Sequence, residues 1–209
     1  MEWHITDAQS LRIIDQEIGE HGFSPAEYEI VRRAIYVTAD FEYANLIRFS
    51  DRALQSGAAA LAARSTIIVD MPMVQVGIAA LIQRTFANPV YCSMDTLTRP
   101  QKEKTTSAWG METLAHRYPE AICIVGQSQT ALRSLMDLVE ADDVRPALVI
   151  GTPAAFVGLE DIDDRLKNAL VPFIHVAGRK GGAMVAAAIA CGLVDLAWQA
   201  YGEGNKVRP

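Results

Sequence analysis

Residues 172–190, PFIHVAGRKGGAMVAAAIA, carry the clearest indication of fold in this 209-residue chain. A continuous apolar run, 172–177, leads into a glycine-rich turn, 178–182, and then into a helix of small residues, 183–190. Continuous rather than alternating apolar runs are typical of parallel strands that are covered on both faces. A strand, a turn and a helix in this order form the repeating unit of an α/β sheet.

Further short apolar runs of the same character precede this unit. They lie at 66–70, 89–93, 121–126 and 147–151. Stretches of helical character separate them, as the crossovers between parallel strands require. We therefore predict an α/β fold, with a mainly parallel sheet flanked by helices, and one domain over residues 1–209.

The expected helices have recognisable starts. Ser24 precedes a proline and stands three residues before Glu27, which is the pattern of a capping box. Ser128 opens a helix that runs to about residue 139, and Asp70 is placed to cap a helix after the strand at 66–70. The part of the chain at 1–60 has helical character throughout, with Thr6 or Asp7 as the first cap, which predicts a helical N-terminal segment.

Composition and charge exclude several classes of protein. Half of the residues are hydrophobic, 21% are charged, and the net charge is −6, which favours a globular protein over a disordered or nucleic-acid-binding one. Because no uninterrupted apolar run is long enough to cross a bilayer and no signal peptide is apparent, we expect a cytoplasmic protein without a membrane partner. The three cysteines lack CxxC spacing, so we predict neither a disulfide framework nor a metal site.

The turn at 178–182 is the most informative candidate site. Arg179 and Lys180 can bind carboxylates or phosphates through charge-assisted hydrogen bonds, and the N–H groups of Gly181 and Gly182 stand where a helix begins. The alternative is a tight turn that carries two solvated cations. The GxxxxGK[ST] spacing of a nucleotide-binding P-loop is absent.

Other segments carry polar groups without a decisive pattern. The loops at 126–130 and 151–158 follow strands and are either binding loops or simple strand-to-helix turns. The segment 36–42 holds a phenol, a hydroxyl and two carboxylates, although Asp40 is also placed to cap the next element. His175 lies in an apolar run, as expected of a core histidine with satisfied hydrogen bonds. No catalytic triad or paired-carboxylate pattern is found.

Taken in order, these segments resemble the precorrin-8X methylmutase family of cobalamin biosynthesis, which includes the cobalt-precorrin-8 methylmutases. The resemblance covers nearly the whole chain and rests on several motifs together rather than on one. They lie at residues 10–17 (SLRIIDQE), 33–41 (RAIYVTADF), 69–78 (VDMPMVQVGI), 146–151, 156–158 and 178–182 (GRKGG).

The resemblance implies an isomerase that moves a methyl group from C11 to C12 of a corrin ring. The product is hydrogenobyrinate from precorrin-8X, or cobyrinate from cobalt-precorrin-8. It also implies that no cofactor is used and that the enzyme is a homodimer with its site near the subunit interface. The motif positions name Tyr36 as the catalytic residue, and as substrate-binding residues Ser10, Thr38, Asp40, Met73, Gln75, Gly77, Thr105, Ser107, Gly178, Arg179, Lys180, Gly181 and Gly182.

The chain departs from the family pattern at two places. Tyr36 stands where the family has the histidine proposed as proton donor, and a phenol, with an ordinary pKa of about 10, is a weaker acid. Thr106 replaces an arginine, which leaves Lys102 or Lys104 to compensate. Two alternatives follow: a non-catalytic corrinoid-binding protein, which the loss of the histidine permits, and a phosphate- or nucleotide-binding α/β enzyme using the 178–182 loop.

Overall fold

The computed structural model describes residues 4–96, 103–157 and 159–202. Its centre is a six-stranded sheet with the strand order β1-β6-β5-β4-β2-β3. The pairs β6–β5, β5–β4, β4–β2 and β2–β3 are parallel, and β1 pairs antiparallel with β6. The strands are β1 (Ile47–Phe49), β2 (Ile67–Val69), β3 (Val90–Cys92), β4 (Ile122–Val125), β5 (Leu148–Gly151) and β6 (Phe173–Val176).

The five predicted strands and the mainly parallel sheet are confirmed, but the expectation of helical structure throughout 1–60 is wrong at β1. Ile47 pairs with Val176 and Phe49 with Ile174, so this edge strand is fixed by contacts with a segment far along the chain. A strand of 3 residues is too short to show a strand period in the sequence.

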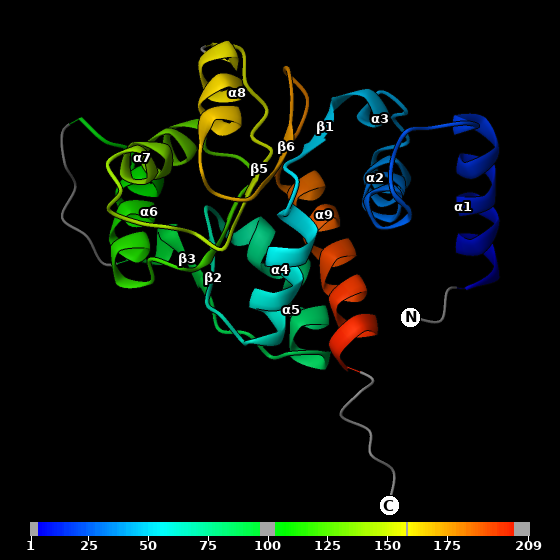
Figure 1. Ribbon diagram of the computed structural model, residues 1–209, viewed down its shortest axis with the longest axis horizontal. Coiled ribbons are helices and arrows are strands. Elements are labelled where there is room, and N and C mark those ends of the chain that lie inside the picture. The colour runs from blue at the N-terminus through cyan, green and yellow to red at the C-terminus, as the bar shows by residue number, and fades with distance from the viewer. Residues whose placement is uncertain (1–3, 97–102, 158, 203–209) are drawn as a thin grey trace, which may run out of the picture.

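Helices cover both faces of the sheet (Figure 1). One apolar core lies between the sheet and α1, α2, α4, α5 and α9, and a second lies between the sheet and α6, α7 and α8. The helices are α1 (Ile5–Ile18), α2 (Pro25–Thr38), α3 (Tyr43–Leu46), α4 (Ala53–Ala62), α5 (Pro72–Arg84), α6 (Thr106–Arg117), α7 (Gln129–Glu140), α8 (Leu159–Asn168) and α9 (Ala183–Ala197). A short 3₁₀ turn, Ser93–Asp95, follows β3, and a π-turn, Trp198–Gly202, follows α9.

Two of the predicted helix caps are confirmed. Ser24 and Glu27 form the capping box of α2, and the Ser128 side chain accepts the Ala131 N–H at the start of α7. The cap of α1 is His4, whose ring nitrogen accepts the Thr6 N–H, rather than Thr6 or Asp7. Asp7 is consequently available for a contact with α2.

Asp70 is buried and does not cap α5, contrary to the prediction. The helix begins after Met71 without a side-chain cap. The Asp70 carboxylate instead accepts the N–H groups of Gly126, Gln127 and Ser128, at 2.9, 2.7 and 2.6 Å. These bonds connect the end of β2 to the loop after β4. The two segments are more than 50 residues apart, so no local sequence pattern could predict this contact.

The helix α9 is the central element of the larger core. It packs against α2, α4 and α5 and against β4 and β5. Residues 183–202 are long and apolar enough to cross a membrane by length and composition alone, but 61% of the most apolar window is buried inside the protein. This burial explains why the helix is apolar: it is a core helix of the protein.

Candidate functional site

The carboxyl ends of the parallel strands meet at one edge of the sheet, which is where open α/β sheets bind ligands. The loops after β4, β5 and β6 converge there with the starts of α5 and α9. Gly126 is one point of close packing, because a Cβ at this residue would lie 2.7 Å from the Val74 side chain and 2.9 Å from Ala183 Cα. Most of the predicted site residues lie along this edge.

Lys180 joins the end of α2 to the loop after β6. Its Nζ lies 2.5 Å from Asp40 Oδ2 and 2.7 Å from Glu42 Oε2. The other carboxylate oxygen of Asp40 accepts the Glu42 N–H at 3.0 Å. Asp40 therefore does not cap α3, contrary to one expectation: the N-cap residue is Glu42, whose N–H Asp40 accepts. Its other carboxylate oxygen holds a lysine of the predicted anion loop, and its role as a substrate ligand remains a prediction.

The Lys180–Asp40 contact shifts the pKa values of both groups. The hydrogen bond from Lys180 is the main cause of a lowered Asp40 pKa, and the bonds to Asp40 and then Glu42 raise the pKa of Lys180 to about 12. Both groups are thus charged through the neutral range. The contribution of Asp40 to stability is present above its ordinary pKa of 3.8 and is lost as the pH falls through the lowered folded value.

This arrangement predicts the effect of Lys180→Met on Asp40. Removing the cation takes away the main interaction that favours the carboxylate form, so the Asp40 pKa is expected to rise toward 3.8. Carbon-13 NMR of the Asp40 carboxyl group, followed from neutral to strongly acidic pH in the wild type and the variant, measures it. The Asp142 carboxylate, paired with Arg145, is the internal control and should not move. Equal Asp40 values in both proteins would contradict the ion pair.

The glycines of the 178–182 loop make contact with the loop after β5. Gly181 has a φ of +152°, and a Cβ there would lie 2.1 Å from the Thr152 carbonyl oxygen. The Gly182 N–H donates to the same oxygen at 2.6 Å. A carboxylate at this loop would therefore meet the exposed Arg179 rather than the Gly182 N–H.

Tyr36 lies on α2 one turn before Asp40, and its hydroxyl group donates to Asp7 Oδ1 on α1 at 2.7 Å. This hydrogen bond is the main cause of a raised pKa of Tyr36, with partial desolvation as a second cause. The phenol is therefore protonated at neutral pH, and its proton points toward Asp7. Nothing in the sequence indicates this partner, because the two residues are 29 positions apart on different helices.

The four predicted hydroxyl residues all make hydrogen bonds within the chain. Ser10 and Thr38 donate to carbonyl groups of their own helices, those of Thr6 and Ala34. Thr105 caps α6 and lies 2.8 Å from the Thr130 hydroxyl group, which joins the starts of α6 and α7. Ser107 donates to the Asp70 carbonyl oxygen at 3.2 Å. Their placement as substrate ligands remains a prediction.

The three predicted residues of α5 point in different directions. Met73 is exposed near the start of the helix. Gln75 donates to the Val90 carbonyl oxygen on the β3 side at 3.5 Å, and Gly77 lies against α9, where its Cβ would be 2.8 Å from the Ala187 side chain. Tyr36, Thr38, Asp40 and the 178–182 loop thus gather at the end of α2, whereas Gln75 and Gly77 face other elements.

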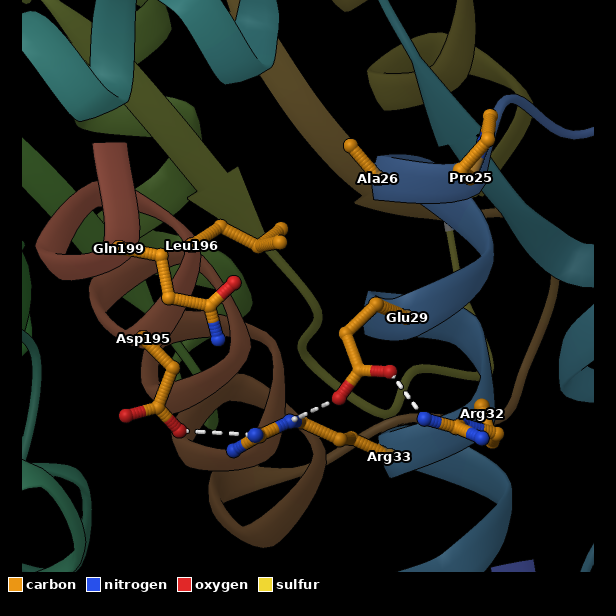
Figure 2. Close-up of a pocket in the computed structure, with 8 residues that line it drawn as sticks. All are labelled: Pro25, Ala26, Glu29, Arg32, Arg33, Asp195, Leu196 and Gln199. Atoms are coloured by element: carbon orange, nitrogen blue, oxygen red, sulfur yellow. Dashed lines mark hydrogen bonds and ion pairs between the residues drawn. The ribbon is translucent and has the colours of Figure 1, made fainter. Parts of the chain in front are cut away.

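A cavity of about 470 Å³ lies away from this edge, where α2 begins and α9 ends. Figure 2 shows Arg33 reaching from α2 to Asp195 of α9 on its wall. Arg33 Nη2 lies 2.7 Å from Asp195 Oδ2, and its Nε lies 3.1 Å from Glu29 Oε1. The two ends of α9 lie about 20 Å apart, so the cavity is well separated from the 178–182 loop. Arg33 of the 33–41 motif therefore joins two helices.

The structure also shows the contacts of His175 and Lys104, whose roles the sequence alone does not decide. His175 is a satisfied core histidine, with Nδ1 2.9 Å from the Gly151 carbonyl oxygen and Nε2 2.5 Å from Asp163. Lys104 is paired with Glu112 at 2.7 Å, and Lys102 lies outside the described residues. Within the described part of the chain, no group of His, Cys, Asp and Glu side chains is arranged to hold a metal ion.

Sequence reasoning missed Asp7 as a neighbour of the site, and it included Glu42 and Phe156 only as members of the candidate segments 36–42 and 151–158, without a role of their own. Phe156 follows β5 and is 79% exposed, and the Arg179 guanidinium lies 5.9 Å from its ring centre. An aromatic residue in a loop directly after a parallel strand is a signal that could have identified Phe156. Asp7 has no such local signal.

Comparison with known proteins gives one family. The family model for precorrin-8X methylmutase matches residues 6–196. A cobalt-precorrin-8 methylmutase from Synechocystis is 38% identical over 91% of this chain and 94% of its own length, and a precorrin-8X methylmutase from Pseudomonas aeruginosa is 32% identical over 86% and 89%. A solved structure of precorrin-8X methylmutase from Thermus thermophilus superimposes with a TM-score of 0.84 at 37% identity, covering 94% of this chain and 99% of that one.

Proposed function

Because the chain belongs to the precorrin-8X methylmutase family and is an isomerase of cobalamin biosynthesis, we propose that it moves the C11 methyl group of cobalt-precorrin-8 to C12. The observation that carries the choice of substrate is the Synechocystis relative, whose name includes cobalt. Relatives from Leptospira interrogans and Methanocaldococcus jannaschii, 31% and 33% identical, have the same name. The metal-free precorrin-8X is the alternative substrate, as in the Pseudomonas aeruginosa relative.

The reaction makes limited chemical demands on the protein. A methyl shift within one molecule needs the ring held in one geometry and one tautomer, and it needs no external methyl donor. Proton placement near the migrating carbon is the step that a side chain can assist. No organic cofactor enters this scheme, and the cobalt ion arrives as part of the substrate.

We propose that Tyr36 is the catalytic residue and that it works as a pair with Asp7. The 2.7 Å hydrogen bond gives the phenol a defined proton acceptor. When the bound ring passes a proton to the Tyr36 oxygen, the hydroxyl proton moves to Asp7. The reverse transfer returns one proton to another ring position, so the tautomer changes while the number of protons is conserved.

We also propose that the enzyme is a cytoplasmic homodimer whose subunits complete the corrin site together. A cavity of about 10 Å³ lies beside the loops after β5 and β6, too small for a macrocycle, and a ligand of that size needs walls on more than one side. Met73, Val76 and Met184 are exposed apolar residues on α5 and α9 near this edge, which suits contact with a second copy. The free thiols of Cys92 and Cys123 suit a reducing compartment.

The dimer predicts a specific result from sedimentation equilibrium at micromolar concentration. The wild type should have twice the 22.8 kDa mass of one chain. Val76→Asp should shift the equilibrium toward the monomer, because it places a charge in an apolar contact. Leu170→Asp, a change at an exposed apolar residue in the α8–β6 connection, is the matched control and should leave the mass unchanged. A wild type with the mass of a single chain at all concentrations would contradict the proposal.

A substrate comparison tests the proposed activity. The enzyme is mixed with equal concentrations of cobalt-precorrin-8 and precorrin-8X in separate reactions, and product formation is followed by the change in visible absorbance. The faster rate is expected with the cobalt compound. A faster rate with the metal-free ring would reassign the substrate, and binding of both rings without conversion would favour the non-catalytic corrinoid-binding protein.

A further inference from the structure

We propose that Phe156 and Arg179 form a platform for one face and one edge of the corrin ring. In this arrangement the phenyl ring stacks on the conjugated macrocycle, and the guanidinium group binds a carboxylate of a ring side chain. The inference rests on the proposed function and adds to it a residue that sets how the substrate is oriented.

The first observation is the exposure of an apolar pair at the carboxyl edge of the sheet. Phe156 and Val157 are 79% and 76% exposed, next to each other at the tip of the loop between β5 and α8. The place of this pair is what makes it informative, because ligands bind at the carboxyl ends of the strands in open α/β sheets and contiguous exposed apolar residues can mark a ligand-binding groove. A flat conjugated ligand is the occupant that suits a single exposed phenyl ring, because offset stacking needs one free face.

The second observation is the charge beside that ring. The Arg179 guanidinium lies 5.9 Å from the Phe156 ring centre. Lys180, its neighbour, is held by Asp40 and Glu42, so its charge is already balanced. Arg179 makes no ion pair with any residue in the ranges that the structure describes, and it is therefore the cation of this loop that is available to an incoming carboxylate.

The third observation is that the loop is fixed rather than free to swing. The Ala155 N–H donates to the Arg179 carbonyl oxygen at 3.4 Å, and the Gln129 side chain donates to the Val157 carbonyl oxygen at 2.5 Å. Beneath the loop, His175 connects the end of β5 to α8 through Asp163. A platform that is built before the ligand arrives loses less entropy on binding.

Titration with two ligands separates the two halves of the platform. The first ligand is cobyrinic acid, and the second is an amidated cobyrinic acid that keeps the ring but replaces side-chain carboxylates with neutral amides. Phe156→Ala should weaken binding of both ligands by about tenfold, the size expected of one aromatic stack. Arg179→Met should weaken binding of the acid by at least about tenfold and leave the amide nearly unchanged.

The controls keep the inference distinct from the proposed function. Phe156→Trp should retain affinity for both ligands, and Leu170→Ala, an exposed apolar residue elsewhere, should change nothing. If the wild type binds neither ligand and converts no substrate, the proposed function fails. If the wild type binds and Phe156→Ala binds equally well, the platform is overturned while the function stands. A Phe156→Ala variant that dissociates into monomers would overturn it too, since Phe156 would then belong to the subunit interface.

Discussion

Replacement of Tyr36 by phenylalanine is expected to slow methyl migration by about 100-fold, while substrate binding survives. The loss corresponds to the usual contribution of one acid–base group, and the ring face that contacts the substrate is retained. Single-turnover rates at saturating substrate measure the chemical step, and an absorbance titration measures binding. A rate within a few-fold of the wild type would mean that Tyr36 only packs against the macrocycle.

Asp7 supplies the variant that tests the pairing. Asp7→Ala removes the acceptor of the Tyr36 proton, and we expect a rate close to that of Tyr36→Phe. The double variant should be no slower than either single one, because residues that act as a unit have non-additive effects. Asp15→Ala, which removes a carboxylate of α1 that contacts Tyr28 and Arg32, is the matched control. An Asp7→Ala enzyme with the wild-type rate would show that the Tyr36 hydroxyl acts alone.

Tyr36→His gives a further check on the position of the catalytic group. The resemblance places a histidine at this site in the family, so a histidine here should retain or raise activity. A folded variant that binds corrin and does not turn over would mean that the proton-transfer group lies elsewhere in this chain.

The second large effect is expected at Asp70, on stability rather than on catalysis. Asp70→Ala leaves the N–H groups of Gly126, Gln127 and Ser128 without their acceptor at the end of the sheet. Hydrogen bonds to a charged group contribute about 1.5–3 kcal/mol each, and the Gly126 N–H is left buried without an acceptor, so the free energy of unfolding should fall by at least about 3 kcal/mol. For a chain of this length the melting temperature should fall on the order of 10 °C.

Urea unfolding and thermal melts measure this loss, and two variants bracket it. Asp70→Asn keeps one acceptor oxygen but turns an amide donor toward N–H donors, so its stability should lie between those of Asp70→Ala and the wild type. Asp51→Ala, at an exposed aspartate in the β1–α4 connection, should change stability by less than about 0.5 kcal/mol. Wild-type stability in Asp70→Ala would contradict the structural role of the carboxylate.

Local patterns in the sequence were sufficient to predict most strands of the sheet and several helix ends. The parallel strands appear as continuous apolar runs, because both faces of the sheet are covered, and Ser24 and Ser128 cap helices through short local bonds. Contacts between distant segments were not predictable. The strand β1 exists through its pairing with β6, and Asp70 binds a loop that belongs to another strand-to-helix connection.

The candidate site shows the same contrast between what local sequence patterns predict and what contacts between distant segments decide. The resemblance identified the motif positions, and the structure brings Asp40 to Lys180 across 140 residues of sequence. The resemblance could not show that Lys180 is already paired or that the Gly182 N–H donates to the Thr152 carbonyl oxygen. It also could not show that Asp7 accepts the hydrogen bond of the Tyr36 hydroxyl group. Each of these depends on packing that two helices or two loops create together.

The methyl-shifting activity of this chain is tested most directly by following the migrating methyl group itself. Cobalt-precorrin-8 labelled with carbon-13 in the C11 methyl group is mixed with excess enzyme, and the NMR signal of the label is recorded with time. We predict that the label moves to C12 at unchanged molecular mass, and that Tyr36→Phe makes the same product about 100-fold more slowly. A label that stays at C11 while the ring is bound would contradict the proposed activity.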